Sequence, residues 1–260
     1  SRSTERVLEV RRLSAPPAVR DATFELYRGE VLGVAGLIGS GRTRMLRSLL
    51  GLLPANTGEI IIGQELLPAG ARRSKLDALM ARGIGYLSED RKGEGLALEL
   101  SVADNTTITN LASCSRWGWL NRRSQTEQTE TWIQKLRIKV RSAESPVANL
   151  SGGNQQKVAI ARLLHQGARI VLMDEPTRGV DIGSKAHIYE AIAEMAAAGN
   201  SVLLVSSYLP ELFGICDRIA VMVRGVLSPP RPVGEWTAET LMHTAIGAAT
   251  PAPVEREFLQ

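Results

Sequence analysis

Residues Asn149–Asp181 read NLSGGNQQKVAIARLLHQGARIVLMDEPTRGVD. The glycine pair at 152–153 predicts a turn that opens into a helix, with Lys157 and Arg162 facing solvent. The predicted core-facing positions of this helix are all apolar: Val158, Ile160, Ala161 and Leu164. The first N–H groups of a helix have no partner within it, and the helix dipole attracts negative charge. This helix start is therefore predicted to bind an anion.

An apolar run, Ile170–Met173, follows the helix and ends in two carboxylates, Asp174 and Glu175. A short, wholly apolar run is typical of a parallel strand that is buried on both faces. Open α/β sheets place their ligands at the carboxyl ends of such strands. An anion-binding helix start followed by a strand that ends in Asp-Glu indicates a nucleotide-binding protein.

The whole stretch resembles the signature motif, Walker B strand and D-loop of ABC-type ATPases, and LSGGNQQK resembles the bacterial sugar-importer form. The resemblance makes Asp174 a Mg²⁺ partner, Glu175 the general base and Asp181 the D-loop aspartate. It also defines the signature, which consists of Leu150, Ser151, Gly152, Gly153, Asn154 and Gln155. The alternative is an ordinary helix, strand and turn of another α/β protein. The separation of LSGG from the Asp-Glu pair disfavours that alternative.

A second motif follows the buried-strand pattern at Val31–Ala35 and precedes a predicted helix at 42–50. It matches the phosphate-binding pattern G-x-x-x-x-G-K-[ST] except at the lysine, and its residues are Gly36, Leu37, Ile38, Gly39, Ser40, Gly41, Arg42 and Thr43. Its N–H groups would surround the β-phosphate of ATP, and Thr43 would offer its hydroxyl to Mg²⁺. Arg42 replaces the lysine with a bulkier, planar guanidinium, which is expected to misplace the contact with the transition state.

Two further positions depart from the family pattern. The strand predicted at 84–87 ends in SEDRKGEG, which resembles the second ATPase half of tandem sugar-importer subunits; a charged surface loop is the alternative. The family usually has a glutamine here that contacts Mg²⁺ and the attacking water, whereas this chain has Glu89. After the strand predicted at 201–205, Ser207 stands where the family places a histidine that contacts the γ-phosphate. The resemblance thus assigns catalysis to Glu175, Glu89 and Ser207, and the metal to Thr43, Asp174 and Glu89.

The predicted fold is an α/β P-loop NTPase of the ABC-ATPase type. It has a mixed sheet core, an antiparallel β subdomain that includes strands at 7–11 and 22–27, and an inserted helical subdomain. The nucleotide-binding domain is expected at 6–247 with the helical subdomain at about 97–165, after a linker or expression remnant at 1–5 and before a flexible tail at 248–260. No adenine-stacking aromatic stands between residues 7 and 20.

The helical subdomain is predicted to contain helices at 102–111, with Ser101 as N-cap, and at 125–138. The tryptophans here are expected in the core rather than on a contact surface: Trp117, Trp119 and Trp132. The histidines lie on predicted helices and are expected at the surface: His165, His187 and His243.

Composition narrows the function. The 260 residues are 44% hydrophobic, which suffices for the core of one large domain. The net charge is only +4, and the basic residues form scattered pairs rather than a stripe, so nucleic acid is not an expected partner. Cys114 and Cys216 resemble no metal or redox pair, and free thiols fit a reducing cytosol. With no apolar run of about 18 residues and no signal peptide, a membrane pore would belong to another polypeptide.

The resemblance implies an ATP- and Mg²⁺-dependent domain that powers carbohydrate import, closest to the C-terminal half of a ribose-, galactose- or xylose-type importer ATPase. Its place would be peripheral, on the cytoplasmic face of the cell membrane. The expected partners are an N-terminal nucleotide-binding half or second ABC ATPase domain, transmembrane permease subunits and, indirectly, a periplasmic or extracellular sugar-binding protein.

The three departures predict weak or absent turnover at the chain's own site, while the intact signature would complete a partner's site. A regulatory half that does not hydrolyse nucleotide, or an importer of nucleosides or signalling molecules, is an alternative. A soluble ABC ATPase acting on DNA or ribosomes would need a basic stripe or a long insert, and the sequence has neither.

Overall fold

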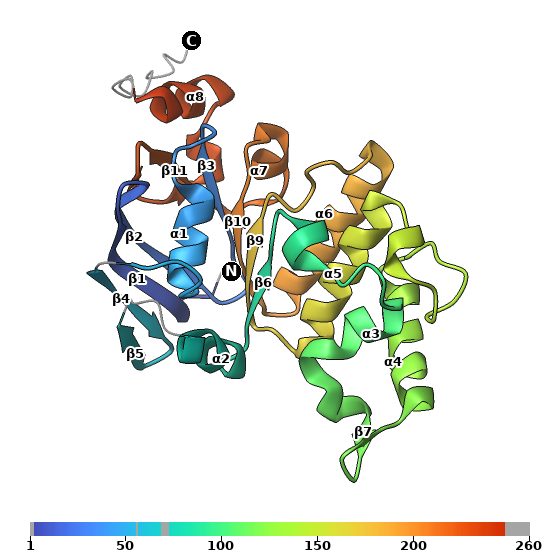
Figure 1. Ribbon diagram of the computed structural model, residues 1–260. Coiled ribbons are helices and arrows are strands. Elements are labelled where there is room, and N and C mark those ends of the chain that lie inside the picture. The colour runs from blue at the N-terminus through green and yellow to red at the C-terminus, as the bar shows by residue number, and fades with distance from the viewer. Residues whose placement is uncertain (1–2, 56, 69–72, 248–260) are drawn as a thin grey trace.

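The computed structural model describes residues 3–55, 57–68 and 73–247. Within these ranges the strands of the main sheet are β1 (Arg6–Ala15), β2 (Val19–Tyr27), β3 (Val31–Gly36), β4 (Thr57–Ile62), β5 (Glu65–Pro68), β6 (Ile84–Leu87), β9 (Ile170–Asp174), β10 (Ser201–Val205), β11 (Arg218–Val223), β12 (Val226–Leu227) and β13 (Arg231–Pro232). The α-helices are α1 (Arg42–Leu49), α2 (Arg73–Ala81), α3 (Val102–Thr107), α4 (Arg122–Lys135), α5 (Gly152–Gln166), α6 (Ile182–Ala197), α7 (Leu209–Ile215) and α8 (Ala238–Ile246). The strand order is β5-β4-β1-β2-β12-β11-β3-β10-β9-β6, with β13 paired to β11 (Figure 1).

The centre of the sheet is parallel and buried. Strands β11, β3, β10, β9 and β6 are neighbours and pair in parallel. In the register, Val205 pairs with both Val34 and Asp174, so β9 and β10 end level and β3 continues to Gly36 on the same edge. Every residue of β9 and β10 is buried, as the continuous apolar runs predicted. Their carboxyl ends form the edge at which the P-loop begins.

The other end of the sheet is antiparallel. Strand β1 pairs with β2 and β4, and β4 pairs with β5, at the left of Figure 1. Apolar residues of β1 and β2 share one core cluster with α1 and the central strands; examples are Leu8, Phe24 and Leu46. The strands predicted at 7–11 and 22–27 are confirmed and are longer than predicted, and the predicted mixed sheet with an antiparallel β subdomain is confirmed.

A helical segment between β6 and β9 lies at the right of Figure 1, with α5 packed against the sheet and α3 and α4 farther from it. The first predicted helix ends at Thr107 and continues as a 3₁₀ segment, Ile108–Cys114, with a kink at Asn110. A two-stranded hairpin follows, made by β7 (Ser115–Arg116) and β8 (Trp119–Leu120). Helix α4 begins at Arg122, three residues earlier than predicted, because the Asn121 side chain caps it by accepting from the N–H of Ser124.

Burial corrects three groups of predictions. Trp117 and Trp119 are 89% and 82% exposed at the hairpin, whereas Trp132 packs against the core. Lys157 is buried rather than exposed, because its ammonium donates to the backbone carbonyl of Arg137. His165 is also buried. Ser113 and Trp132 contact its two ring nitrogens, so both nitrogens have hydrogen-bond partners without water.

In the part of the chain that the structure describes, no helix is both long and apolar enough to cross a bilayer. The tail predicted at 248–260 lies outside the described residues, as do residues 1–2 of the expected N-terminal remnant.

Candidate functional site

The glycine-rich loop at 36–43 connects β3 to α1 and depends on two glycines. A Cβ on Gly41, whose φ is +108°, would lie 2.1 Å from the carbonyl oxygen of Ala18. A Cβ on Gly36, whose φ is +153°, would lie 2.6 Å from the carbonyl oxygen of Met222. Neither approach leaves room for a side chain, so the loop can close over the start of α1 only with glycine at both positions.

A pocket of about 460 Å³ lies over this loop, and residues distant in sequence line it. Its wall includes Arg42, Thr43, Glu89, Glu175, Arg178 and Ser207. All three positions that depart from the family pattern therefore meet at one cavity with the P-loop. This convergence follows because β3, β6, β9 and β10 are parallel and end at the same edge of the sheet.

The Arg42 side chain at the pocket wall forms an ion pair with Glu175. Its Nη2 lies 3.4 Å from Oε1 of Glu175, and their side chains are only 7% and 10% exposed. Ser207 donates a hydrogen bond to the other oxygen, Oε2, over 3.1 Å. Both oxygens of the candidate general base therefore have partners. Burial lowers the pKa of Arg42, while the nearby carboxylates of Glu175 and Asp174 oppose that shift.

Thr43 and Asp174 meet beneath the pocket. The Thr43 hydroxyl donates to Oδ1 of Asp174 over 3.1 Å, while Oδ2 is buried without a hydrogen-bond partner. Burial raises the pKa of Asp174 to about 6, the Thr43 hydrogen bond opposes the rise, and the Glu175 charge adds to it. A hydroxyl beside a buried carboxylate oxygen with no partner is a suitable donor pair for Mg²⁺, which prefers oxygen ligands.

Residues 88–95 are tied to the P-loop helix rather than free in solvent. The segment forms a π-helical turn at Arg91–Gly95, and Asp90 caps it by accepting from two backbone N–H groups. Glu94 forms an ion pair with Arg47 of α1 over 2.8 Å and accepts from the Ser88 hydroxyl. These side chains are therefore bonded to the P-loop helix, although Asp90, Lys92 and Glu94 remain exposed. Glu89, at the pocket wall, forms an ion pair with Arg178 of the loop after β9.

Arg91 connects this turn to the signature, a contact that sequence reasoning missed. Its guanidinium donates to the backbone carbonyl of Gly152 over 2.5 Å and to that of Arg178 over 3.3 Å. A Cβ on Gly152 would lie 3.3 Å from the same guanidinium. Arg91 and Arg178 both stand within motifs visible in the sequence. The partners of Arg91 could not be inferred from the sequence, because they are backbone carbonyls of two distant segments.

The signature lies at the start of α5 and does not line the pocket over the P-loop. Ser151 caps the helix and is exposed, Gly152 is half-buried, and the next three residues are buried. Asn154 accepts from the backbone N–H of Lys139, and Gln155 donates to the carbonyl of Val147. The structure therefore separates the predicted signature into an exposed start and a packed remainder.

The D-loop aspartate, Asp181, caps α6 by accepting from the N–H of Ser184 over 2.9 Å. A hydrogen bond from the Ser184 hydroxyl, together with this backbone contact, lowers the pKa of Asp181. A Cβ on Gly153 would lie 2.4 Å from Oγ of Ser184. The starts of α5 and α6 are therefore packed against each other, and the glycine pair makes this approach possible.

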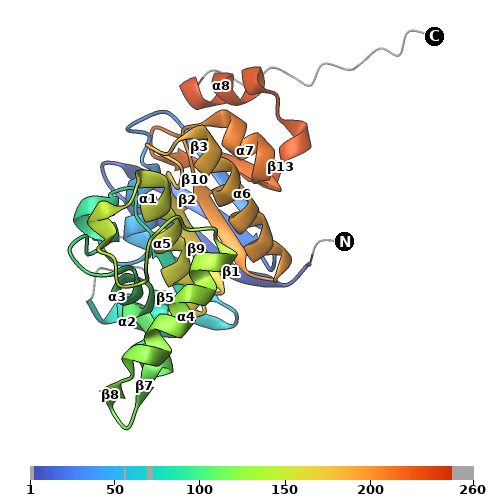
Figure 2. The same ribbon diagram turned by 90° about the vertical axis from the view of Figure 1, so that its right-hand side faces the viewer.

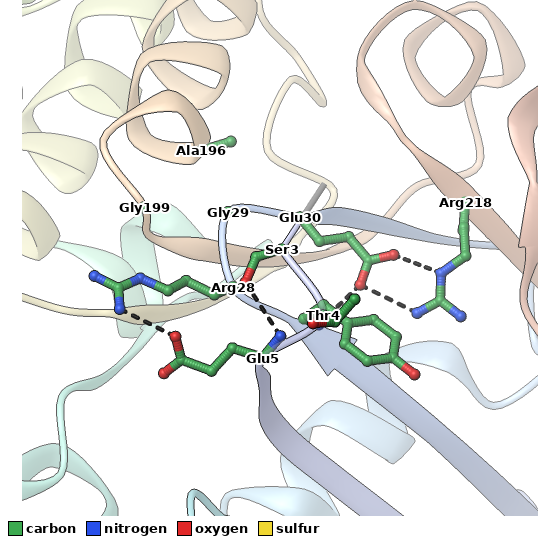
Figure 3. A pocket seen from close by; sticks show the side chains of 10 residues that line it. Ser3, Thr4, Glu5, Arg28, Gly29, Glu30, Ala196, Gly199 and Arg218 are labelled. Atoms are coloured by element: carbon green, nitrogen blue, oxygen red, sulfur yellow. Dashed lines mark hydrogen bonds and ion pairs between the residues drawn. The ribbon is translucent and has the colours of Figure 1, made fainter. Parts of the chain in front are cut away.

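A larger cavity, of about 1020 Å³, opens at the opposite edge of the sheet, where β3, β10 and β11 begin. Figure 3 shows that its charged side chains pair with one another: Glu30 with Arg218 over 2.5 Å, and Glu5 with Arg28 over 3.1 Å. It contains none of the predicted site residues. Its ionic groups already have partners, so the smaller pocket over the P-loop is the candidate site.

Comparison with known proteins agrees with this geometry. Residues 19–178 match the family model described as "ABC transporter". The chain is 44% identical over 248 residues to the ribose import ATP-binding protein RbsA 2 of Rhizobium meliloti, covering 95% of this chain and 48% of that protein. It is 40% identical over 241 residues to RbsA of Bacillus licheniformis, covering 93% and 48%. The chain thus spans about half the length of these curated relatives.

Solved structures share the fold. A nucleotide-free ATP-binding cassette from an ABC transporter has a TM-score of 0.72 at 20% identity, over 87% of this chain and 91% of that one. The cassette MJ1267 of an ABC transporter has a TM-score of 0.76 at 20% identity, over 94% and 98%. The predicted cassette fold is confirmed.

Proposed function

Because the chain belongs to the ABC transporter family of ATP-binding domains, we propose that it binds MgATP over its P-loop and powers carbohydrate import. Its high identity to proteins named as ribose import ATP-binding proteins supports a sugar as cargo. The resemblance of SEDRKGEG supports the C-terminal half of a tandem importer ATPase, working at the cytoplasmic face of the membrane.

The ion pair between Arg42 and Glu175 carries the proposal that the chain's own site turns over slowly. A general base must reach the attacking water, but both oxygens of Glu175 are engaged by Arg42 and Ser207. Arg42 must also leave this carboxylate before it can contact phosphates. The third departure, Glu89, is paired with Arg178. The site would therefore bind nucleotide but hydrolyse it weakly or not at all.

The residues present fit a Mg²⁺ ion. The Thr43 hydroxyl and the unpartnered Oδ2 of Asp174 would hold it, and Glu89 at the pocket wall would offer a further carboxylate. When bound, the ion would neutralise charge on the phosphate oxygens. The P-loop N–H groups and Thr43 would position the nucleotide, and Glu175 would accept a proton from water once Arg42 has moved away.

The signature would serve a second ATPase domain. Ser151 is exposed and lies outside the chain's own pocket, so its hydroxyl, which accepts from Asn154 within the helix start, would also face another subunit. Large apolar side chains also stand exposed after the central strands, which is typical of a surface that a partner covers: Leu37, Ile38, Ile182 and Tyr208. The proposed partners are therefore an N-terminal half or second ABC ATPase domain, a transmembrane permease and, indirectly, a sugar-binding protein.

A regulatory half without turnover is the second candidate, and the same Arg42–Glu175 pair favours it. In that case nucleotide occupancy alone would act on the partner. Import of nucleosides or signalling molecules is a further alternative for the cargo, since the permease and the binding protein select it.

Calorimetry of MgATP binding, beside a phosphate-release assay and an Arg42→Lys variant, tests the nucleotide site. Binding by the wild type without measurable hydrolysis supports an occupied, slow site. Tighter binding by Arg42→Lys would locate the defect at Arg42, because lysine is more compact and leaves Glu175 free. Absence of binding by both proteins would refute ATP binding at this P-loop.

Transport by the assembled importer tests the division of roles. Replacement of Ser151 or Gly152 should abolish most transport, because it damages the partner's site. Glu175→Gln should have a much smaller effect, because the chain's own site contributes little hydrolysis. Equal loss in both variants would show that this assignment is wrong.

A further inference from the structure

The hairpin between the 3₁₀ segment and α4 exposes two of the chain's largest apolar side chains. Trp117 and Trp119 are 89% and 82% exposed. The hairpin projects from the end of the helical segment, away from the main sheet, in both views (Figures 1 and 2). Ile108 and Leu111, on the adjoining 3₁₀ segment, are 50% and 42% exposed. A protruding apolar patch of this kind needs a physical reason.

The backbone conformation shows that tryptophan at position 117 does not stabilise the turn. Trp117 and Gly118 have φ of +56° and +82°, the left-handed pair that joins two strands tightly. Asparagine followed by glycine is the favoured sequence for such a turn, whereas a bulky residue at positive φ is strained. Because the Trp117 side chain is 89% exposed, its burial within the domain contributes little to the free energy of folding. The fold thus tolerates this tryptophan at a cost, which points to a role outside the fold.

Charge identifies the kind of surface that the tip fits. Residues 113–124 contain Arg116, Arg122 and Arg123 and no acidic residue. Arg122 pairs with Asp104 over 2.7 Å and Arg123 with Glu127 over 2.9 Å, but all three arginines are exposed. In the described part of the chain, no acidic side chain forms an ion pair with Arg116. Exposed pairs are weak, so these guanidinium groups can exchange partners with lipid phosphates.

We propose that this hairpin tip, residues 116–119 with the flanking arginines, inserts into the headgroup region of an anionic lipid bilayer. Tryptophan is favoured where one part of its ring is apolar and the other is wet, and arginine adds attraction to anionic lipid. A stable protein interface buries about 800 Å² on each partner, which four residues at a narrow tip cannot offer. The inference rests on the proposed function only in that both place the domain at a membrane.

Trp fluorescence of the isolated chain without nucleotide tests the proposal. Vesicles of phosphatidylglycerol and phosphatidylcholine should shift the emission to the blue, and lipids with brominated chains should quench it. Pure phosphatidylcholine vesicles should have a weaker effect. Trp132 and Trp236 are partly or wholly buried and serve as the internal background.

The variants separate insertion from folding. Trp117→Asn should keep or raise the melting temperature, since it supplies the preferred turn residue, while it weakens vesicle binding about tenfold. Trp119→Ser should weaken binding by a similar factor, and Arg116→Gln should remove part of the preference for anionic lipid.

Absence of wild-type binding, or unchanged binding by a Trp117→Asn/Trp119→Ser double variant, would overturn the proposal. Protection of these rings from acrylamide only when the permease is present would instead assign the tip to a protein partner. Because no nucleotide is used, failure here leaves the calorimetric test of the proposed function intact.

Discussion

Nη2 of Arg42 lies 3.4 Å from Oε1 of Glu175, and the two groups follow different strands: Arg42 begins α1 after β3, and Glu175 comes directly after β9. Under the proposed function, this pair engages the residue that would contact phosphate and the carboxylate that would contact water. Each group therefore restrains the other until a ligand competes for one of them.

Glu175→Gln should release Arg42 toward phosphate. We expect MgATP to bind the isolated variant several-fold more tightly, and the free energy of unfolding without nucleotide to fall by about 1–3 kcal/mol, because a buried charge loses its partner. Calorimetry and urea unfolding measure the two quantities. Ser207→Ala, which removes only the hydrogen bond to Glu175, should change both much less. An unchanged dissociation constant in Glu175→Gln would show that the ion pair does not compete with nucleotide.

Asp174 should make stability without metal depend on pH. Its folded-state pKa is raised from 3.8 to about 6, so the folded protein holds this proton more firmly than the unfolded chain. The resulting stabilisation is fully present below pH 3.8 and is lost as the pH rises through about 6.

Unfolding titrations in a chelator, with Asp174→Asn as the reference, measure this contribution. The wild type should lose about 3 kcal/mol relative to the variant between these two pH values. Mg²⁺ at pH 7 should restore part of the loss in the wild type only. A pH-independent difference between the two proteins would contradict the burial of an ionisable group at this position.

Arg91→Gln should loosen the start of α5. The substitution removes charge-assisted hydrogen bonds to the carbonyls of Gly152 and Arg178, which costs about 1–3 kcal/mol. Hydrogen exchange should speed up at residues 152–156 and in the loop after β9, with little change in the main sheet. Lys92→Gln is the matched control. Lys92 follows Arg91 in the same turn but is exposed, so its replacement should leave hydrogen exchange unaltered. Uniform acceleration across the domain would indicate general destabilisation instead.

Gly41→Ala and Gly39→Ala should differ sharply although both glycines have positive φ. A Cβ on Gly39 meets no atom within 4 Å, so that variant bears only backbone strain, about 1 kcal/mol. A Cβ on Gly41 would lie 2.1 Å from the Ala18 carbonyl oxygen, so the loop must shift at a cost of about 4 kcal/mol or more. Thermal unfolding compares the two variants, and similar melting temperatures would show that the loop is plastic.

Local sequence patterns predicted the elements that carry the fold. The apolar runs at β9 and β10 and the glycines around α1 have local physical causes, namely burial on both faces and backbone geometry. Those causes act within a few residues. The buried central strands, the starts of α1 and α5 and the edge of the sheet where the candidate site lies could therefore be expected from the amino-acid sequence alone, whereas the start of α4 could not.

Contacts between loops could not be expected in the same way. The pairing of Glu89 with Arg178 and the reach of Arg91 depend on how several loops approach one another at the end of the sheet. The wrong prediction of burial for two tryptophans has another cause. Composition favours burial for Trp117 and Trp119, but a two-residue turn lifts them off the domain regardless of their hydrophobicity.

The bonds of Arg91 have a mechanical consequence for the whole domain. Because one guanidinium is attached to the backbone of two other segments, a push on residues 88–95 from a neighbouring subunit would be transmitted directly to the start of α5. Such a signal would bypass the nucleotide altogether. The exposed start of α5 at Ser151 would then move with residues 88–95 even while Arg42 and Glu175 stay paired in the pocket.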